Sequence, residues 1–454
     1  MQLKDKKVLV FGAAKSGISA TRLLQKQGAS VTLYDGNADL KIEDFNNEFD
    51  IKKQFTAMFG EFNESLIGIT ELLVISPGIA IDHPIVEKFR MKGVPVWGEI
   101  ELAYQFSRGK IIGITGTNGK TTTTALVGEI MKTYFSEVYV VGNIGNPYTD
   151  IAMEATDQAV SVIELSSFQL ETIHEFKPEI SAILNITPDH LNRHHTMENY
   201  IKMKENVATN QTMSELCVLN YEDKILRDLA DRLHTRVMFF SSATKLENGL
   251  FLSNEDIFYA IDGINQLVCN VNELQILGTH SYENVMAAVG IAITMGIPMN
   301  MIKKAITSFQ AVEHRIEYVE TIRGVTYYND SKGTNPDASI KAVQAMKSPT
   351  IVIGGGYDKN SEFDEWIEAF DGKVQYLVLL GQTREKIAST AIKHGFTNII
   401  MVDSLRDAVR VSAEKANDGD AVLLSPACAS WGMFENFEQR GRLFKEYVRE
   451  MLKF

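Results

Sequence analysis

A run of glycine, lysine and threonine between positions 113 and 121 has the composition of a phosphate-binding loop. It reads Gly113-Ile114-Thr115-Gly116-Thr117-Asn118-Gly119-Lys120-Thr121. Glycines let backbone N–H groups approach phosphate oxygens, the lysine neutralises the β- and γ-phosphates, and the threonine hydroxyl can ligate Mg²⁺. The strict motif has glycine at position 114, where isoleucine stands here. Even so, the run favours a nucleoside triphosphate site over an ordinary glycine-rich turn.

The elements around this loop are those that such a site requires. Apolar residues at 111–114 precede the loop and predict a buried strand. Residues 122–132 carry apolar side chains at helical spacing, so we predict a helix after the loop. A strand-to-helix turn points the positive N-terminal end of the helix at a bound anion.

Two further strand ends carry polar side chains that suit phosphate and metal chemistry. The apolar run 159–163 delivers Glu164 to the carboxyl end of a predicted strand, the place where a P-loop domain puts its acidic metal partner. The run 180–186 predicts the next buried strand, which Asp189 and His190 follow. A histidine of this kind is more often structural, but its place at a third strand end favours a role in the site. Before these two strands, residues 140–145 form a glycine turn that contains Asn143.

The stretch after His190 predicts a helix that begins at Thr196, a good N-cap residue. Tyr200 and Lys204 are four residues apart and therefore share a face of this helix. A helical lysine is usually a surface residue. Residues 215–275 have a β-rich, irregular pattern without evident chemistry. Asn284 precedes an apolar helix at 285–294 and could lie near a nucleotide base.

The first hundred residues have the order of predicted elements that is typical of a dinucleotide-binding unit. A strand at 8–11, a glycine turn at 12–17 and a helix at 18–26 are followed by a strand at 30–34 that ends at Asp35. Ala14 replaces the middle glycine and would crowd a nicotinamide cofactor's pyrophosphate, although the turn could hold another nucleotide's diphosphate. We predict a nucleotide-recognition module, with a purely structural Rossmann-like domain as the alternative.

The last third of the chain predicts another α/β unit. Its strands are expected at 325–328, 350–353, 376–380 and 421–424. The loops 329–336, 354–359 and 425–430 follow three of these strands, so they should gather at one edge of a sheet.

Length and composition set the class of protein. A chain of 454 residues suggests about three domains. The net charge of −13 argues against a nucleic-acid partner, since nonspecific binding depends on clustered Lys and Arg. Three scattered cysteines without metal-ligand spacing favour a reducing, cytoplasmic environment. Without a signal peptide or a membrane-spanning apolar run, we expect a soluble protein with no membrane partner.

We therefore predict an α/β protein of three domains: a Rossmann-like N-terminal domain at 1–96, a central P-loop ATPase domain at 97–312 and a Rossmann-like C-terminal domain at 313–454. Residues 93–98 are expected to form the first linker.

Five motifs in fixed order together resemble the Mur ligase family, which builds the peptide stem of the bacterial cell wall. They are Gly116-Thr117-Asn118-Gly119-Lys120-Thr121, Glu164-Leu165-Ser166-Ser167-Phe168-Gln169, Asp189-His190, Glu313-His314-Arg315 and Asn329-Asp330-Ser331-Lys332. The close of the chain, residues 424–430 and 436–441, is similar to the D-glutamate-adding branch of the family. The resemblance covers all three predicted domains.

The resemblance implies a synthetase with a UDP-sugar domain, an ATPase domain and an amino-acid domain. The substrates would be ATP, UDP-N-acetylmuramoyl-L-alanine and D-glutamate, joined through an acyl phosphate with release of ADP and phosphate in peptidoglycan precursor synthesis. Two Mg²⁺ ions would offset charge on the phosphates and the carboxylate. Lys204 matches the family's carbamylated lysine, in which CO₂ turns an ammonium into a carboxylate-like metal ligand. We expect a monomer.

Carried over residue by residue, the resemblance implies five sets of site residues. The catalytic set is Lys120, His190 and Lys204, and the metal ligands are Thr121, Glu164, His190 and Lys204. The ATP set is Gly116, Thr117, Asn118, Gly119, Lys120, Thr121, Thr122, Asn284, Arg315, Asp330 and Lys332. The UDP-substrate set is Ser16, Asp35, Gly78, Asn143 and His190, and the D-glutamate set is Lys332, Thr334, Lys359, Ser430 and Phe437.

The chain departs from the family at His280-Ser281, where His-Asn is common, which leaves Asn284 to hold the adenine. Three alternatives stay open. A folylpolyglutamate-synthase-like ligase shares the loop but is disfavoured by the first domain and by residues 425–430. A P-loop switch or motor would hydrolyse nucleotide without needing an amino acid. An oxidoreductase would bind a nicotinamide cofactor in the first domain.

Overall fold

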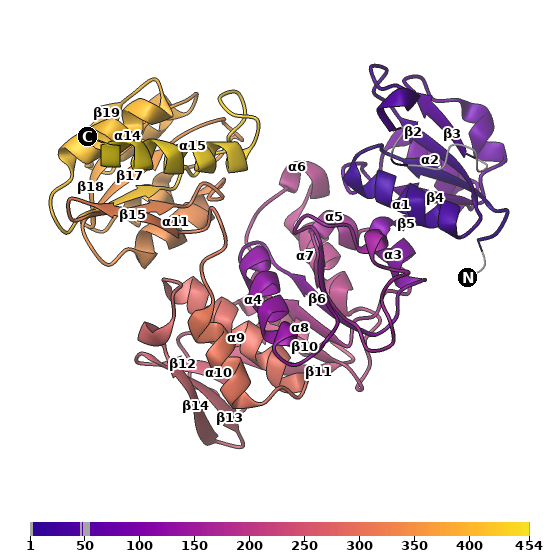
Figure 1. Ribbon diagram of the computed structural model, residues 1–454, viewed down its shortest axis with the longest axis horizontal. Coiled ribbons are helices and arrows are strands. Elements are labelled where there is room, and N and C mark those ends of the chain that lie inside the picture. The colour runs from indigo at the N-terminus through magenta and orange to yellow at the C-terminus, as the bar shows by residue number, and fades with distance from the viewer. Residues whose placement is uncertain (1–2, 46–47, 49–54, 454) are drawn as a thin grey trace. The chain divides into compact units, whose positions relative to one another are not determined.

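A computed structural model describes residues 3–45, 48 and 55–453 (Figure 1). The described strands form three sheets, which confirms the predicted α/β class with three domains. The chain divides into two compact units, one of residues 1–270 with 283–306 and the other of residues 271–282 with 307–454. The first two sheets belong to the first unit and the third sheet to the second unit.

The first sheet has five parallel strands in the order β3-β2-β1-β4-β5. They are β1 Lys7–Phe11, β2 Ser30–Asp35, β3 Phe55–Phe59, β4 Leu72–Ile75 and β5 Val96–Gly98. The helices beside them are α1 Lys15–Lys26, α2 Pro84–Met91 and α3 Glu99–Tyr104.

The predicted linker at 93–98 is wrong, because its second half is the edge strand β5. Val96 pairs with Leu73 and Gly98 with Ile75 in parallel register. Three buried residues, Val96, Trp97 and Gly98, are enough to complete this edge of the sheet.

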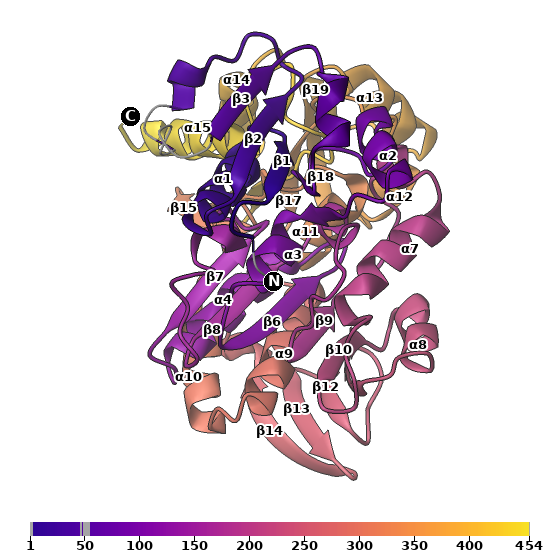
Figure 2. The same cartoon turned by 90° about the vertical axis from the view of Figure 1, so that its right-hand side faces the viewer.

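The second sheet has nine strands in the order β14-β13-β12-β11-β10-β9-β6-β8-β7, parallel except around β13. They are β6 Lys110–Thr115, β7 Val138–Gly142, β8 Val160–Glu164, β9 Ile180–Ile183, β10 Leu216–Asn220, β11 Arg236–Ser241, β12 Gly249–Ser253, β13 Asp256–Ile261 and β14 Ile264–Asn270. The helices are α4 Lys120–Lys132, α5 Ser167–Leu170, α6 Leu191–His194, α7 Met197–Glu205, α8 Lys224–Ala230, α9 Thr279–Thr294 and α10 Met299–Ser308. Figure 2 shows α4 beside β7 and β8, on which it packs.

The third sheet has the order β15-β16-β20-β17-β18-β19, with only β15 antiparallel to its neighbour. Its strands are β15 Glu317–Ile322, β16 Val325–Asn329, β17 Thr350–Gly354, β18 Val374–Leu379, β19 Ile399–Met401 and β20 Ala421–Leu424. The helices are α11 Pro336–Ala345, α12 Asp364–Glu368, α13 Arg384–Lys393, α14 Leu405–Lys415 and α15 Phe437–Glu450.

Burial on both faces explains why the strands of the third sheet are continuous apolar runs. In β17, Val352 belongs to a core with α11, α12 and α13, whereas Ile351 and Ile353 belong to a core with α14 and α15. Successive side chains of a strand point to opposite faces, so each face receives alternate residues. The carboxyl ends of β16, β17 and β20 are thereby held side by side.

A single hydrophobic core joins the first two sheets within the first unit. It contains Val10 and Leu24 of the first sheet's layer, and Ile163 and Ile183 of the second sheet. The polar contact Ser19 Oγ to Thr149 Oγ1, 2.6 Å long, reinforces this junction. No helix among the described residues is long and apolar enough to span a membrane.

Candidate active site

The phosphate loop lies between β6 and α4, in the middle of the second sheet. Gly116 and Gly119 have φ angles of 151° and 85°, in the region that glycine adopts most easily. A Cβ on Gly119 would lie 2.3 Å from Asn284 Oδ1, so the loop and Asn284 touch only because this residue is glycine. α4 starts at Lys120, and the first backbone N–H groups of a helix have no partner within it. The loop therefore ends at a helix terminus suited to an anion.

Lys120 and Lys204 converge on one backbone oxygen of this loop. Lys120 Nζ donates to Gly116 O at 2.9 Å and to Thr117 O at 2.8 Å. Lys204 Nζ, from α7, donates to the same Gly116 O at 2.7 Å. The Lys204 side chain is 1% exposed, so it is not a surface lysine. Burial, followed by the nearby Lys120 charge, holds the pKa of Lys204 well below its ordinary value.

The loop is also fixed to the segment after β9 by hydrogen bonds in both directions. Asn118 N donates to Asn185 Oδ1 at 2.8 Å, and Asn185 Nδ2 donates to Asn118 O at 3.1 Å. Thr117 Oγ1 accepts from Thr187 N at 2.9 Å and lies 3.0 Å from the Tyr200 hydroxyl. Tyr200 is 1% exposed, and burial raises its pKa. The loop is thus held in place before any ligand arrives.

Glu164 is the last residue of β8 and pairs in register with Ile114 of β6. It is 1% exposed, and its Oε1 accepts from Asn143 Nδ2 at 2.8 Å. Its other oxygen, Oε2, is buried and has no hydrogen-bond partner among the described residues. An unsatisfied buried carboxylate oxygen is costly unless a ligand completes it. With Thr121 in the first turn of α4, Glu164 therefore fits a hard divalent cation, which prefers oxygen ligands.

His190 lies on an exposed turn after β9, which ends at Ile183 rather than at Ile186 as predicted. Its backbone is left-handed, with φ of 52°. Its ring contacts Phe168 at 4.9 Å between centroids, and its Nε2 is 3.5 Å from Asp189 Oδ2.

The first sheet brings Ser16 and Asp35 to its carboxyl edge. Asp35 Oδ2 accepts the Ala13 N–H of the glycine turn at 2.8 Å, so the acid braces the turn. Ser16 is half-buried in the first turn of α1. A Cβ on Gly17 would lie 1.8 Å from Gly12 O, which shows that these two glycines serve close packing. Gly78 follows β4, is exposed, and would leave a Cβ in open space.

In the second unit, Arg315 and Asp330 lie in segments that are bonded together. Arg315 stands between two left-handed residues, His314 with φ of 68° and Ile316 with φ of 45°. Ile316 N donates to Asp330 Oδ1 at 3.3 Å, and Ser425 Oγ donates to Asp330 Oδ2 at 2.7 Å. Burial raises the pKa of Asp330 to about 7 despite these donors.

The five predicted D-glutamate residues fall at two neighbouring places in the second unit. Lys332 Nζ lies 3.7 Å from the ring centroid of Phe437, and Thr334 N donates to Lys332 O at 2.8 Å. Lys359 is exposed, and its Nζ lies 5.6 Å from the ring of Trp431, which follows the buried Ser430. Arg440 joins the two places, since it donates to Ser331 O at 2.8 Å and to Cys428 O at 3.2 Å.

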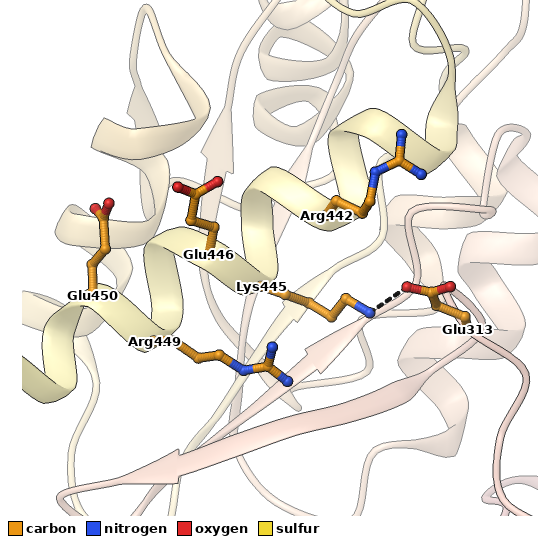
Figure 3. A pocket seen from close by; sticks show the side chains of 6 residues that line it. All are labelled: Glu313, Arg442, Lys445, Glu446, Arg449 and Glu450. Atoms are coloured by element: carbon orange, nitrogen blue, oxygen red, sulfur yellow. Dashed lines mark hydrogen bonds and ion pairs between the residues drawn. The ribbon is translucent and has the colours of Figure 1, made fainter.

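A charged groove on α15 lies outside the predicted site (Figure 3). Its lining residues are Glu313, Arg442, Lys445, Glu446, Arg449 and Glu450. Lys445 Nζ binds Glu313 Oε1 at 2.5 Å and Glu317 Oε1 at 2.9 Å. Glu313, His314 and Glu317 have ligand atoms within 4.8 Å of one another, but the Lys445 ammonium already pairs with both carboxylates. The cluster is therefore an ion-pair network that ties α15 to the segment before β15.

Several residues that shape the site have no sequence signal. Arg193 Nη2 donates to Ile79 O of the first sheet's layer at 2.8 Å and to Glu171 Oε2 at 2.7 Å. His194 is 5% exposed, bonds Ser167 Oγ at 2.9 Å, and burial lowers its pKa to about 4. Asn185 carries a weak signal, because asparagine is unfavourable inside the strand predicted there.

Family models match the chain in three consecutive segments. Residues 6–98 match the "Mur ligase MurD-like, N-terminal domain", residues 114–292 the "Mur ligase middle domain", and residues 314–428 the "Mur ligase, glutamate ligase domain".

Curated relatives are similar over the full length. The UDP-N-acetylmuramoylalanine–D-glutamate ligase of Lachnoclostridium phytofermentans is 56% identical over 451 residues, covering 99% of each chain. The enzyme of the same name from Lachnospira eligens is 54% identical over 99% of this chain and 100% of its own. That from Clostridioides difficile is 47% identical over the same shares.

Solved structures agree on the fold. The UDP-N-acetylmuramate-alanine ligase of Thermotoga maritima has a TM-score of 0.61 at 18% identity, covering 98% of this chain and 99% of that one. A MurF ligase of Thermotoga maritima, solved with ADP, has a TM-score of 0.62 at 15% identity, covering 99% of each chain. At these identities the likeness shows the fold alone.

Proposed function

The chain belongs to the Mur ligase family, and from that premise we propose how its residues carry out the reaction. The reaction is the ATP-dependent addition of D-glutamate to UDP-N-acetylmuramoyl-L-alanine in peptidoglycan synthesis. A folylpolyglutamate ligase, a P-loop switch and an oxidoreductase are thereby set aside.

We assign one substrate to each domain, at the boundaries 1–96, 97–312 and 313–454. Ser16, Asp35 and Gly78 at the edge of the first sheet hold the UDP group, with Asn143 and His190 at the sugar end. The assignment is supported by the turn that Asp35 braces, because this turn leads into the N-terminus of α1, which suits a diphosphate.

The phosphate loop activates the substrate carboxylate. A free carboxylate does not condense with an amine at neutral pH, so its oxygen first attacks the γ-phosphorus of ATP and ADP leaves. The D-glutamate amine then attacks the acyl phosphate carbon, loses a proton, and inorganic phosphate departs as the amide forms. Lys120 offsets phosphate charge in both steps, Gly116 to Thr122 cradle the phosphates with their backbone, and Asn284 holds the adenine.

Two Mg²⁺ ions fit the residues around this loop. Thr121 and the unsatisfied Glu164 oxygen would hold one ion. His190 and Lys204 would hold the other, with Lys204 in its carbamate form because an ammonium cannot ligate a cation. When bound, the ions would neutralise the phosphate oxygens and the substrate carboxylate.

The observation that carries this assignment is the burial of Lys204 beside Lys120. Two ammonium groups on one carbonyl oxygen repel each other, so the fully buried one favours its neutral form. A neutral amine adds CO₂ to give a carbamate and one proton. The resulting anion would face Lys120, which turns the repulsion into attraction.

We assign Arg315, Asp330 and Lys332 to ATP, and Lys332, Thr334, Lys359, Ser430 and Phe437 to D-glutamate. Lys359 and Thr334 take one carboxylate, Ser430 and nearby backbone N–H groups take the other, and Phe437 packs on the methylene stem. The bonds of Arg440 to Ser331 O, next to Lys332, and to Cys428 O, two residues before Ser430, support one continuous site.

We further propose that the enzyme works as a cytoplasmic monomer. Incubation with ATP, Mg²⁺, UDP-N-acetylmuramoyl-L-alanine and D-glutamate should yield one product, heavier than the acceptor by one glutamate residue in mass spectrometry. Absence of that product would contradict the assignment.

A further inference from the structure

Thr383 lies where three loops of the third sheet are in contact. The loops follow β17, β18 and β20, and the Thr383 side chain is 1% exposed among them. Its Oγ1 accepts the Gly356 N–H at 3.0 Å and lies 3.3 Å from both Gly356 O and Cys428 Sγ. One hydroxyl therefore joins the loop after β17 to the loop after β20.

The position of Thr383 in the chain makes this use of its hydroxyl unusual. Thr383 is the N-cap residue of α13, and a threonine there ordinarily accepts a backbone N–H of the first helical turn. Here it makes no side-chain capping bond. The hydroxyl is diverted from stabilising its own helix to holding Gly356 and Cys428.

The two loops that Thr383 joins lie so close together that Gly356 has no room for a side chain. A Cβ on Gly356, whose φ is 155°, would lie 2.3 Å from Ala429 O. Tyr357 N donates to Ala429 O at 2.9 Å, and Gly355 N donates to Pro426 O at 2.8 Å. A small change at Thr383 would therefore shift both loops together.

We propose that Thr383 is a positioning residue for the amino-acid substrate. Its hydroxyl contacts Gly356, which is three residues before Lys359 in the sequence. It also contacts Cys428, which is two residues before Ser430. Its hydroxyl sets the separation of the two loops that present these carboxylate-binding side chains. The inference rests on the proposed D-glutamate site and deepens it.

The test compares Thr383→Val with Thr383→Ser. Valine keeps the shape but leaves the buried Gly356 N–H without an acceptor, whereas serine keeps the hydroxyl. Thr383→Val should raise KM for D-glutamate about tenfold or more, while KM for ATP and for the UDP substrate changes less than about twofold. Thr383→Ser should restore KM for D-glutamate to within about threefold of wild type.

Thr390→Val is the matched control, because Thr390 is on the same helix and its hydroxyl donates to Lys386 O within that helix. Its KM for D-glutamate should equal that of wild type. A Thr383→Val enzyme with a lower Tm but an unchanged KM for D-glutamate would overturn the proposal. Thr383 would then contribute to stability alone.

If Thr383→Val does not fold, Cys428→Ala, which removes the second partner of the hydroxyl, must raise KM for D-glutamate selectively, and an unchanged KM overturns the proposal. Failure of the proposed function is distinct from either result, since the wild-type enzyme would then not use D-glutamate at all.

Discussion

Lys120 and Lys204 donate to the same carbonyl oxygen, Gly116 O, at 2.9 and 2.7 Å. One lysine is at the end of the phosphate loop and the other is on α7, and the three strands β7, β8 and β9 lie between them in the sequence. Two ammonium groups so close, one of them fully buried, are stable only if one loses its charge or meets an anion. This relationship is the basis of the first prediction.

Lys204→Ala should reduce kcat by at least about a hundredfold, because the variant loses the group proposed to become a metal-binding carbamate. Short carboxylic acids such as acetate should partly restore turnover by supplying the missing anion. Intact-protein mass spectrometry after equilibration with ¹³CO₂ and chemical trapping should show one carbamate on the wild-type chain.

The matched control is Lys202→Ala, on the same helix but exposed, which should keep wild-type activity. Full activity in Lys204→Ala, or no trapped carbamate on wild type, would contradict a carbamylated Lys204.

Glu164→Gln should raise the Mg²⁺ concentration needed for half-maximal activity by about tenfold or more. The substitution keeps the shape and removes the charge of a buried oxygen that has no other partner among the described residues. Titration of activity with Mg²⁺ measures the change. Glu129→Gln, an exposed residue on α4 that pairs with Lys132, serves as the control. An unchanged Mg²⁺ requirement would remove Glu164 from the metal site.

Lys359→Ala should raise KM for D-glutamate by about tenfold to a hundredfold and leave KM for ATP nearly unchanged. A carboxylate that loses a charged partner is poorly compensated by water in a formed pocket. Steady-state kinetics with each substrate varied measures both constants, and Lys393→Ala, whose ammonium pairs with Asp364, is the control. An unchanged KM for D-glutamate would show that Lys359 is a solvated loop lysine.

The strands that were predicted best are short apolar runs bounded by turn residues. β20, for example, has the predicted bounds, 421–424. The prediction omitted β15 and β19, since β15 is a polar edge strand and β19 has only three residues. The linker prediction failed at β5 for the same reason of length. Local pattern carries little information about strands whose pairing supplies most of their stability.

The site residues at strand ends could be predicted from the sequence, whereas contacts between residues far apart in the sequence could not. The position of Glu164 could be predicted from the single apolar strand that it ends. Asn185 meets Asn118 across 67 residues, and Thr383 meets Cys428 across 45 residues. Contacts of this kind depend on topology, which places distant loops at one edge of a sheet.

Glu99→Gln should make stability less sensitive to pH. Glu99 is 2% exposed, accepts from Thr149 N at 2.6 Å, and keeps a buried oxygen without a partner among the described residues. Burial raises its pKa from 4.5 to about 7. Folding therefore favours its protonated form, and its contribution is complete below pH 4.5 and declines as the pH rises through about 7.

The wild-type chain should consequently lose up to about 3 kcal/mol of unfolding free energy relative to Glu99→Gln between pH 4.5 and 8. Denaturant titrations of both proteins across this range measure the difference. Glu154→Gln, an exposed substitution, should run parallel to wild type. Parallel curves for Glu99→Gln as well would mean that Glu99 titrates normally.

Phosphate release measured with ATP, Mg²⁺ and UDP-N-acetylmuramoyl-L-alanine against a panel of amino acids tests the central claim most directly. We predict release of ADP and phosphate that requires both the UDP substrate and D-glutamate, with no AMP or pyrophosphate, because the loop at Lys120 presents the γ-phosphoryl group. Turnover as fast with L-glutamate, L-lysine or diaminopimelate, or formation of pyrophosphate, would contradict a D-glutamate ligase acting through an acyl phosphate.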